Sequence, residues 1–488
     1  MASADLQAAL AAHRFGLGEP SLAPLASDPR GWLLAQIAPA SAQRGSGLAT
    51  GMEGTRRYAQ FVAQQATARS VPAGNMPASA AMTASDQRTA EQQFGEQFRS
   101  IVQSDLRARL STAALSDRPF NERLALFWAN HFTVSGAKAS ARGIAGAFER
   151  EAIRPHIAGR FETLLKAAVQ HAGMLRYLDN DSSAGPDSPL VLRQARRARP
   201  EGTAPPRITG LNENLAREVL ELHTLGVSGG GAGFGGWGGY TQRDVSAFAS
   251  VLTGWRVPLA RTVNAADDGD ATRFEPTWHQ PGPKTVLGKS YAEGPQALAE
   301  VLSDLARQPS TARFLAFKLA RHFVADDPPP ALVARLEASY RSSDGDLAAL
   351  YRTLLHSPEA WAAPAAKLKT PEEFVISTVR VLGLGEEAFA RQPDAGIGIL
   401  GQRVQAAPSP AGWPDRAEDW LGPDAVWKRV EWATRVAARA GRAQDARALA
   451  RASLGPLLHD DSARQIERAA DGAQAMALLL MSPEFQRR

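Results

Sequence analysis

The residues best able to do acid–base chemistry in this sequence gather in one short stretch. Positions 212–223 combine carboxylates, an arginine, amides and a histidine within about three turns of a predicted helix. At about 100° per residue, Asn214, Arg217, Glu218 and Glu221 fall on one side of that helix, next to an apolar face. We expect this side to line a cleft, in which one carboxylate pairs with Arg217 and stays ionised. The other carboxylate is poorly solvated there and acts as a general acid.

A plainer interpretation of the same stretch stays open. The polar residues also suit a solvated helix face, on which Arg217 and Glu221 form an ordinary ion pair one turn apart. His223 falls on the opposite, apolar side of the helix, so we expect it to be buried and hydrogen-bonded to a backbone carbonyl rather than catalytic.

Further candidates follow two other predicted helices. Asp179 comes directly after the helix at 174–178, and it is a candidate to oppose Glu218, since glycoside cleavage needs two carboxyl groups on either side of the bond. Asn130 and His131 end the helix at 119–131, where His131 is a candidate base or a structural histidine. The predicted catalytic set is therefore Glu218, Glu221, Asp179 and His131, and the predicted substrate-binding set is Asn214, Arg217, Asn130, Tyr240 and His279.

Composition removes several other classes of site. The sequence has no cysteine, which excludes disulfides, thiolate metal sites and cysteine nucleophiles. No zinc-type histidine spacing occurs, and the glycine tract at 229–239 has neither a preceding strand nor a following lysine–serine or lysine–threonine pair. We therefore expect no metal and no cofactor, and we interpret the glycine tract as a flexible spacer.

Charge and hydropathy bear on partners and location. The chain of 488 residues carries 55 basic and 50 acidic side chains, a balance too even to indicate nucleic-acid binding. No apolar stretch approaches the roughly 18 residues of a membrane span, and the first residues lack the pattern of a secretory signal. We expect a protein that is either cytoplasmic or exported after removal of a leader.

Helical periodicity dominates the sequence and predicts an all-α fold, a single large irregular helical bundle with long loops and at most a short hairpin near 285–289. We expect N-terminal helices in 1–38, a mobile low-complexity segment at 39–90 with one helix at 57–66, and a main helical domain at 91–488. That domain contains long loops at 180–210 and 226–240. Its last helix is expected at 461–480.

Several of these segments resemble one bacterial protein family, the domain of unknown function eighteen hundred. The segments are FWANHF at 127–132, MLRYLDN at 174–180, NENLAREVLELHTLG at 212–226, GYT at 239–241, HQPGPK at 279–284, KLARHF at 318–323, PSPAGW at 408–413 and SPEF at 482–485. Their order along the whole chain is similar to that of the family. The resemblance implies one helical bacterial domain, with some exported members, and it implies no activity.

The clustered carboxylates lead us to expect a hydrolase of a polysaccharide or envelope glycan, with a glycan or other anionic or polar polymer as substrate. Two other hypotheses stay open. The protein could instead be a scaffold or partner protein for an exported factor, with its tryptophans as contact anchors. It could also be a metal-dependent phosphoesterase that uses His131, Asp179 and His223.

Overall fold

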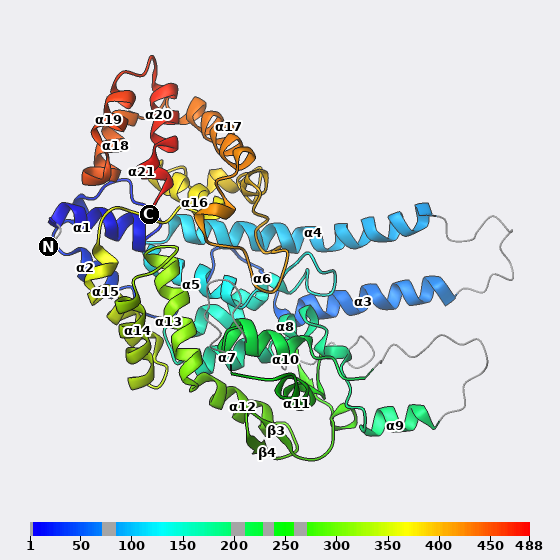
Figure 1. Ribbon diagram of the computed structural model, residues 1–488. Coiled ribbons are helices and arrows are strands. Elements are labelled where there is room, and N and C mark those ends of the chain that lie inside the picture. Colours follow the sequence, from blue (N-terminus) through cyan, green and yellow to red (C-terminus); the bar gives the residue numbers. More distant parts are fainter. Residues whose placement is uncertain (1–2, 71–83, 197–209, 228–238, 258–270) are drawn as a thin grey trace.

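The protein is built of helices, as the sequence predicts. The computed structural model describes residues 3–70, 84–196, 210–227, 239–257 and 271–488 (Figure 1). Within these ranges the strands form only two antiparallel two-stranded ribbons. The ribbon β3–β4 pairs Thr285 with Ser290 and confirms the predicted hairpin, whereas the pairing of Trp255 with Phe274 in β1–β2 was not predicted.

The elements of the N-terminal half are α1 (Ala4–Leu10), η1 (Ala11–Phe15), η2 (Ala23–Leu25), α2 (Pro29–Leu34), α3 (Gly51–Ser70), α4 (Ala84–Leu115), α5 (Pro119–His131), α6 (Ala145–Phe148), η4 (Glu149–Ile153), η5 (Arg154–His156), α7 (Phe161–Gln170), α8 (Ala172–Tyr177), η6 (Asn180–Ser182), α9 (Pro189–Ala195), α10 (Asn214–Glu218), η7 (Val219–Thr224), α11 (Gln242–Leu252) and β1 (Trp255–Arg256). Here η1, η4 and η7 are π-helices and the other η elements, in both halves, are 3₁₀-helices.

The elements of the C-terminal half are β2 (Arg273–Phe274), η8 (Pro276–Trp278), β3 (Lys284–Val286), β4 (Lys289–Tyr291), α12 (Gln296–Ala306), α13 (Pro309–Phe323), α14 (Pro330–Ser342), α15 (Leu347–His356), η9 (Pro358–Trp361), α16 (Pro371–Val381), η10 (Glu386–Phe389), η11 (Ile397–Leu400), η12 (Ala417–Asp419), α17 (Pro423–Ala440), α18 (Ala446–Leu454), η13 (Gly455–Leu457), α19 (Asp460–Glu467), α20 (Gly472–Met481) and α21 (Pro483–Gln486). None of the described helices has both the length and the apolarity that crossing a membrane requires.

The helices α3 and α4 extend side by side away from the rest of the protein (Figure 1). Where they approach the body, Phe98 and Ile101 of α4 are buried with Ala49, and Tyr58 and Phe61 of α3 pack against them. Helix α3, with 20 residues, is twice as long as the helix predicted at 57–66. Residues 71–83 of the predicted low-complexity segment lie outside the described residues.

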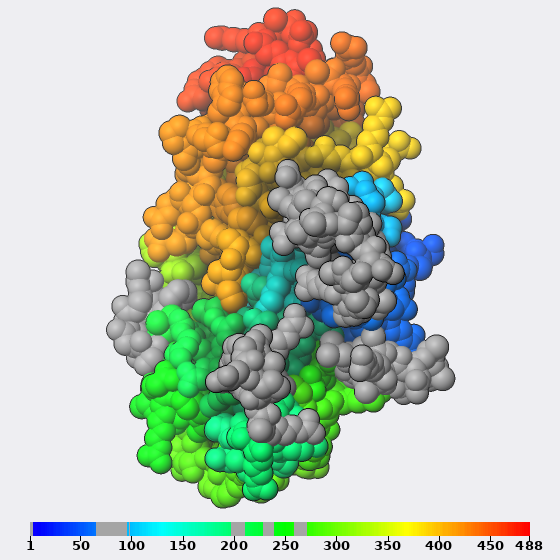
Figure 2. Space-filling model, turned by 90° about the vertical axis from the view of Figure 1, so that its right-hand side faces the viewer, coloured from blue at the N-terminus to red at the C-terminus, as the bar shows by residue number. Residues whose placement is uncertain are grey.

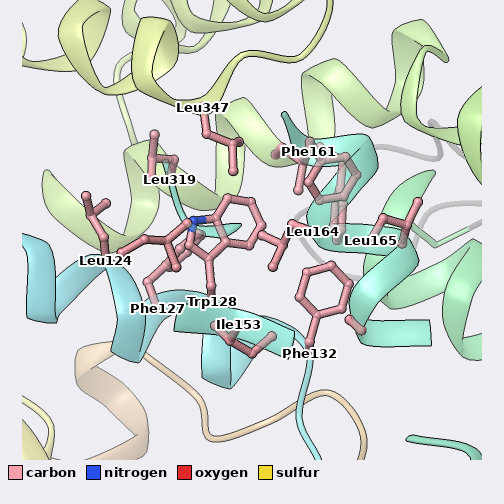
Figure 3. Close-up of a cluster of buried hydrophobic side chains, with 14 of the residues drawn as sticks. Leu124, Phe127, Trp128, Phe132, Ile153, Phe161, Leu164, Leu165, Leu319 and Leu347 are labelled. Atoms are coloured by element: carbon pink, nitrogen blue, oxygen red, sulfur yellow. The ribbon is translucent and has the colours of Figure 1, made fainter. Parts of the chain in front are cut away.

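Helix α5 passes between the two large hydrophobic cores. Leu124 and Trp128 belong to the first core, shown in Figure 3, whereas Leu126 belongs to the second, which the C-terminal helices form. The indole Nε1 of Trp128 donates a hydrogen bond of 2.6 Å to the Tyr351 hydroxyl, which donates one of 2.6 Å to the carbonyl of Ile157. These bonds satisfy the polar atoms of two large buried side chains. Because most of its side chains are buried, α5 holds its C-terminal residues in a fixed place.

The C-terminal helices α16–α21 gather at one end of the protein, coloured yellow to red in Figure 1, and the same end is visible in Figure 2. The single helix predicted at 461–480 is wrong, since the structure has α19 and α20 there. The helix is interrupted here because the side chain of Asp471 caps the start of α20 by accepting a hydrogen bond from the backbone N–H of Gln474. At this break Gly472 lies so close to Gly441 that a Cβ atom on either would meet the other's backbone.

Candidate functional site

The best candidate for a site is a cavity of about 250 Å³ at the end of α5. Five segments distant in sequence contribute side chains to it: α5, η7 with the residues after it, α13, the start of α16, and the loop before α17. Its lining residues include Asn130, His131, Glu221, Phe314, Lys318, Arg321, His322, Thr370, Glu372, Glu373, Gln402, Trp413, Asp415, Arg416 and Asp419. Aromatic walls with several converging polar groups are typical of a binding site for a small molecule.

The loop before α17 is held against α5 by the amide of Asn130. This amide donates to the carbonyl of Trp413 at 2.8 Å and accepts from the Trp413 backbone N–H at 2.8 Å. Gly412 has a φ of +82°, and a Cβ atom there would lie 2.5 Å from the Asn130 carbonyl oxygen. Only glycine fits both conditions, so Gly412 permits the loop to approach α5 and to place Asp415 at the cavity.

Glu221 reaches the cavity from a π-helix. The chain changes from α10 to η7 at Val219, and the wider turn alters the direction of every later side chain relative to an α-helix. The predicted ion pair between Arg217 and Glu221 is therefore wrong. Arg217 instead contacts Glu213 at 3.1 Å and Gln242 at 3.0 Å, while Glu221 lines the cavity. Such π-segments are rare and are often found at functional sites.

Glu218 lies one turn before Glu221 in a poorly solvated place. Burial raises the pKa of its carboxyl to about 7, with a further contribution from the charge of Glu221 and an opposing one from Arg217. Glu218 also helps raise the pKa of Tyr177 to about 12, although burial is the main cause of that shift. The sequence predicts that one of the two carboxylates is poorly solvated, and Glu218 has this environment. Glu218 is not, however, among the residues that line the cavity.

His131 and His223 form a pair of buried, neutral imidazoles. The Nε2 atom of His131 lies 3.1 Å from the His223 carbonyl oxygen, which can only accept, so Nε2 carries the proton and Nδ1 is unprotonated. Burial lowers the pKa of His131 well below its ordinary value, and the charge of Lys318 adds to this effect. The predicted burial of His223 is confirmed, but the predicted hydrogen bond is wrong, since neither ring nitrogen of His223 has a partner among the described residues.

Helix α13 and the loop before α17 contribute a cluster of titratable side chains to the cavity, namely Lys318, His322 and Asp415. Burial by itself would raise the pKa of Asp415, but the imidazole of His322 and the ammonium of Lys367, 3.8 and 3.9 Å away, outweigh it and hold this pKa well below its usual range. Burial lowers the pKa of Lys318 to about 8, in spite of attraction by Asp415 and with help from Arg321. Asp415 is therefore ionised at neutral pH, and a fraction of Lys318 is uncharged.

The two carboxylates at the start of α16 have firm partners elsewhere. Glu372 accepts from the Nε atom of Arg109 at 2.9 Å. Glu373 accepts hydrogen bonds from Arg123 and, at 3.1 Å, from the Nε atom of Arg488, and both of these guanidinium groups are buried. These pairs build the wall of the cavity and leave Glu221, Asp415 and Asp419 as its other carboxyl groups.

The structure brings together only part of the predicted site. Asn130, His131 and Glu221 line the cavity, with Glu218 one turn away, whereas the remaining predicted residues do not line it. Asp179 forms an exposed ion pair of 2.6 Å with Lys138. Asn214 is exposed and Arg217 is held by Glu213, while Tyr240 packs against the first core. His279 is buried, with Nδ1 at 2.7 Å from the Thr253 carbonyl and Nε2 at 2.8 Å from the Lys284 ammonium.

Sequence reasoning missed Lys318, His322 and Asp415. The signal was present, because Lys318 and His322 belong to the segment KLARHF and Asp415 comes two residues after PSPAGW. Of the three residues of the phosphoesterase hypothesis, His131 and His223 lie side by side with ring centroids 6.0 Å apart, whereas Asp179 is paired with Lys138. Within the described ranges no group of three acidic or histidine side chains could hold a metal ion. Residues 229–238 of the predicted spacer lie outside those ranges.

Comparison with known proteins gives a family for this chain. No curated protein and no solved structure matches it significantly. One family does match, described as "Protein of unknown function (DUF1800)", over residues 10–487. That match covers nearly the whole sequence, including both segments that supply Lys318 and Asp415 to the cavity. The chain therefore belongs to the DUF1800 family.

Proposed function

We propose that this protein hydrolyses glycosidic bonds in a polysaccharide or other envelope glycan, with Glu221 and Asp415 at the reacting bond. The main support is that these two carboxyl groups come from separate segments of the chain and line one cavity together with His131. Glycoside cleavage needs two carboxyl groups that flank the bond. Glu218 and Glu221 are only one turn apart on one helix, so they cannot easily do so alone.

The pKa values of the carboxyl groups suggest which of them acts as the base or nucleophile and which acts as the proton donor. Asp415 stays ionised because of His322 and Lys367, which suits a base or a nucleophile. Glu218 keeps a proton up to about pH 7, chiefly because it is buried, which suits a proton donor. In this proposal the carboxyl group of Glu221 contacts the leaving oxygen in the cavity and gives it a proton. Glu218, one turn away, then supplies a proton to Glu221. Carboxyl groups whose environments shift their pKa values apart are typical of an acid and base that work together.

Other lining residues would bind and orient the sugar. Asn130 is held by Trp413, so its remaining N–H has a fixed direction, and Phe127 and Phe314 supply apolar surface. The unprotonated Nδ1 of His131 has no partner among the described residues and would accept a hydroxyl proton if the ligand comes within reach.

Turnover of a polysaccharide panel tests the proposal. Purified protein is incubated with neutral and acidic polysaccharides and with cell-wall glycan, and new reducing ends are measured. We expect Glu221→Gln and Asp415→Asn each to lower turnover by about 10²- to 10⁴-fold. The matched control is Glu300→Gln, an exposed carboxylate on α12, which should keep full activity. Circular dichroism and thermal melting of each variant separate lost chemistry from lost folding.

Two results would contradict the proposal. Full turnover by folded Glu221→Gln and Asp415→Asn would remove both residues from the mechanism. Absence of turnover and of binding on the whole panel, together with a stable protein partner on co-purification, would favour the scaffold hypothesis.

A further inference from the structure

Lys318 differs from every other lysine of this protein. The sequence has eight lysines, and all of them lie in the described ranges. Lys318 lines the cavity, and it has no hydrogen bond or ion pair with the described residues. Its Nζ atom lies 5.5 Å from the centroid of the Phe314 ring. An amine that lines a cavity without a polar partner keeps its nitrogen free for a ligand.

Six other lysines already have polar partners. They are Lys138 with Asp179, Lys166 with Glu162, Lys284 with His279, Lys289 with Asp304, Lys367 with Asp326, and Lys428 with Asp424. The seventh, Lys369, has no hydrogen-bond partner among the described residues, but it is completely buried against the Phe485 ring and is not among the residues that line the cavity of Lys318.

We propose that Lys318 is a nucleophilic amine that binds a small aldehyde or ketone in this cavity as an imine. In this step the uncharged Nζ attacks the carbonyl carbon and forms a C=N bond. The carbonyl oxygen leaves as water, carrying the two protons that the neutral amine held, so no oxidant or reductant is consumed. The cavity, at about 250 Å³, has room for a small carbonyl compound.

The groups around Lys318 favour its uncharged form. Burial on α13 disfavours the ammonium, and Arg321 on the same helix adds repulsion. His131 and His322 contribute no charge, since burial lowers both of their pKa values. Asp415 attracts the ammonium without contacting it. The remaining charged groups of the lining are Glu221, Glu372, Glu373, Arg416 and Asp419.

The balance of these influences sets how much amine can react. With a pKa of about 8, roughly a tenth of Lys318 is uncharged at about pH 7, whereas an ordinary lysine of pKa about 10.4 is uncharged in fewer than one molecule in a thousand. A desolvated lysine of this kind is a known type of Schiff-base nucleophile. The inference does not rest on glycan hydrolysis, because formation of an adduct is read without any turnover.

Reductive trapping tests the inference. The full chain is incubated at pH 7 with glyceraldehyde and cyanoborohydride, and peptide mass spectrometry measures the modified fraction of each lysine with time. We expect Lys318 to react at least about tenfold faster than exposed Lys289 or half-buried Lys428, with a pH–rate inflection near 8. Lys318→Arg should remove the fast phase, while Lys289→Arg, the matched control, should keep it.

Labelling of Lys318 no faster than that of Lys289 overturns the inference. It is also overturned if the fast phase persists in a folded Lys318→Arg variant. A third independent readout uses ¹³C-dimethylated protein, in which the NMR titration of the Lys318 methyl signals should have its midpoint near pH 8 rather than above pH 10.

Discussion

Replacing Glu218 by glutamine should stabilise this protein above neutral pH, although Glu218 is assigned to the proposed mechanism. Its pKa rises from an ordinary 4.5 in the unfolded chain to about 7 in the folded one, first because of burial and then because of Glu221. Between these two pKa values the folded protein holds a proton that the unfolded chain has lost. Stability therefore falls as pH rises from about 4.5 to about 7.

The size of the effect follows from the same shift. At about 1.4 kcal/mol for each tenfold change in proton affinity, a change from 4.5 to about 7 sets an upper bound near 3.5 kcal/mol. Glu218 is only partly buried, so solvent screening reduces this figure, and we expect about 1–2 kcal/mol. Glutamine cannot ionise, so Glu218→Gln avoids this loss above pH 7.

Urea denaturation at a series of pH values from 4.5 to 8.5 measures the difference between the variant and the natural chain. We expect a difference near zero at the acidic end that grows through pH 7 and then becomes constant, while Glu300→Gln shows no such trend. A difference that is the same at every pH, or a variant that is less stable at pH 8, would refute the argument. NMR titration of the Glu218 carboxyl carbon gives the midpoint independently.

Two further predictions concern the walls of the cavity. Glu373→Gln leaves the buried guanidinium of Arg123 without its ion pair and should lower the free energy of unfolding by about 3–5 kcal/mol, whereas Glu359→Gln, which breaks an exposed pair, should cost less than about 1 kcal/mol; urea titration compares them. Equal costs would contradict the importance of burial. Gly412→Ala places a Cβ atom against the carbonyl of Asn130 at a positive φ, so we expect a loss of at least about 1–2 kcal/mol and weaker ligand binding, measured by thermal melting and calorimetry. An unchanged melting temperature would show that the loop does not need this close approach.

Much of the fold follows from local patterns. Helix α5 occupies 119–131, as its apolar periodicity and its N-terminal proline predict. Apolar periodicity predicts helix ends wrongly where a capping residue or a contact distant in sequence interrupts the helix. The apolar residues from 461 to 480 suggest one helix, but the cap at Asp471 and the contact of Gly472 with Gly441 divide it.

The candidate site was predictable only in part. Asn130, His131 and Glu221 could be proposed from residue type and helical phase, but Arg217 and Asp179 were assigned to a cleft that they do not reach. A regular α-helix was assumed through Glu221, and the π-helix that redirects this side chain leaves no clear sign in the spacing of residues.

The sequence by itself determined the helical class, the family and the chemical identity of several residues that line the cavity, because these depend on periodicity and on side-chain type. Only the tertiary structure decided which groups meet. Lys318 and Asp415 are ordinary residues of their own segments, and they gain shifted pKa values when α5, α13 and the loop before α17 close around one cavity. The physical reason is that desolvation and charge interaction depend on distance in space, which helical spacing does not record.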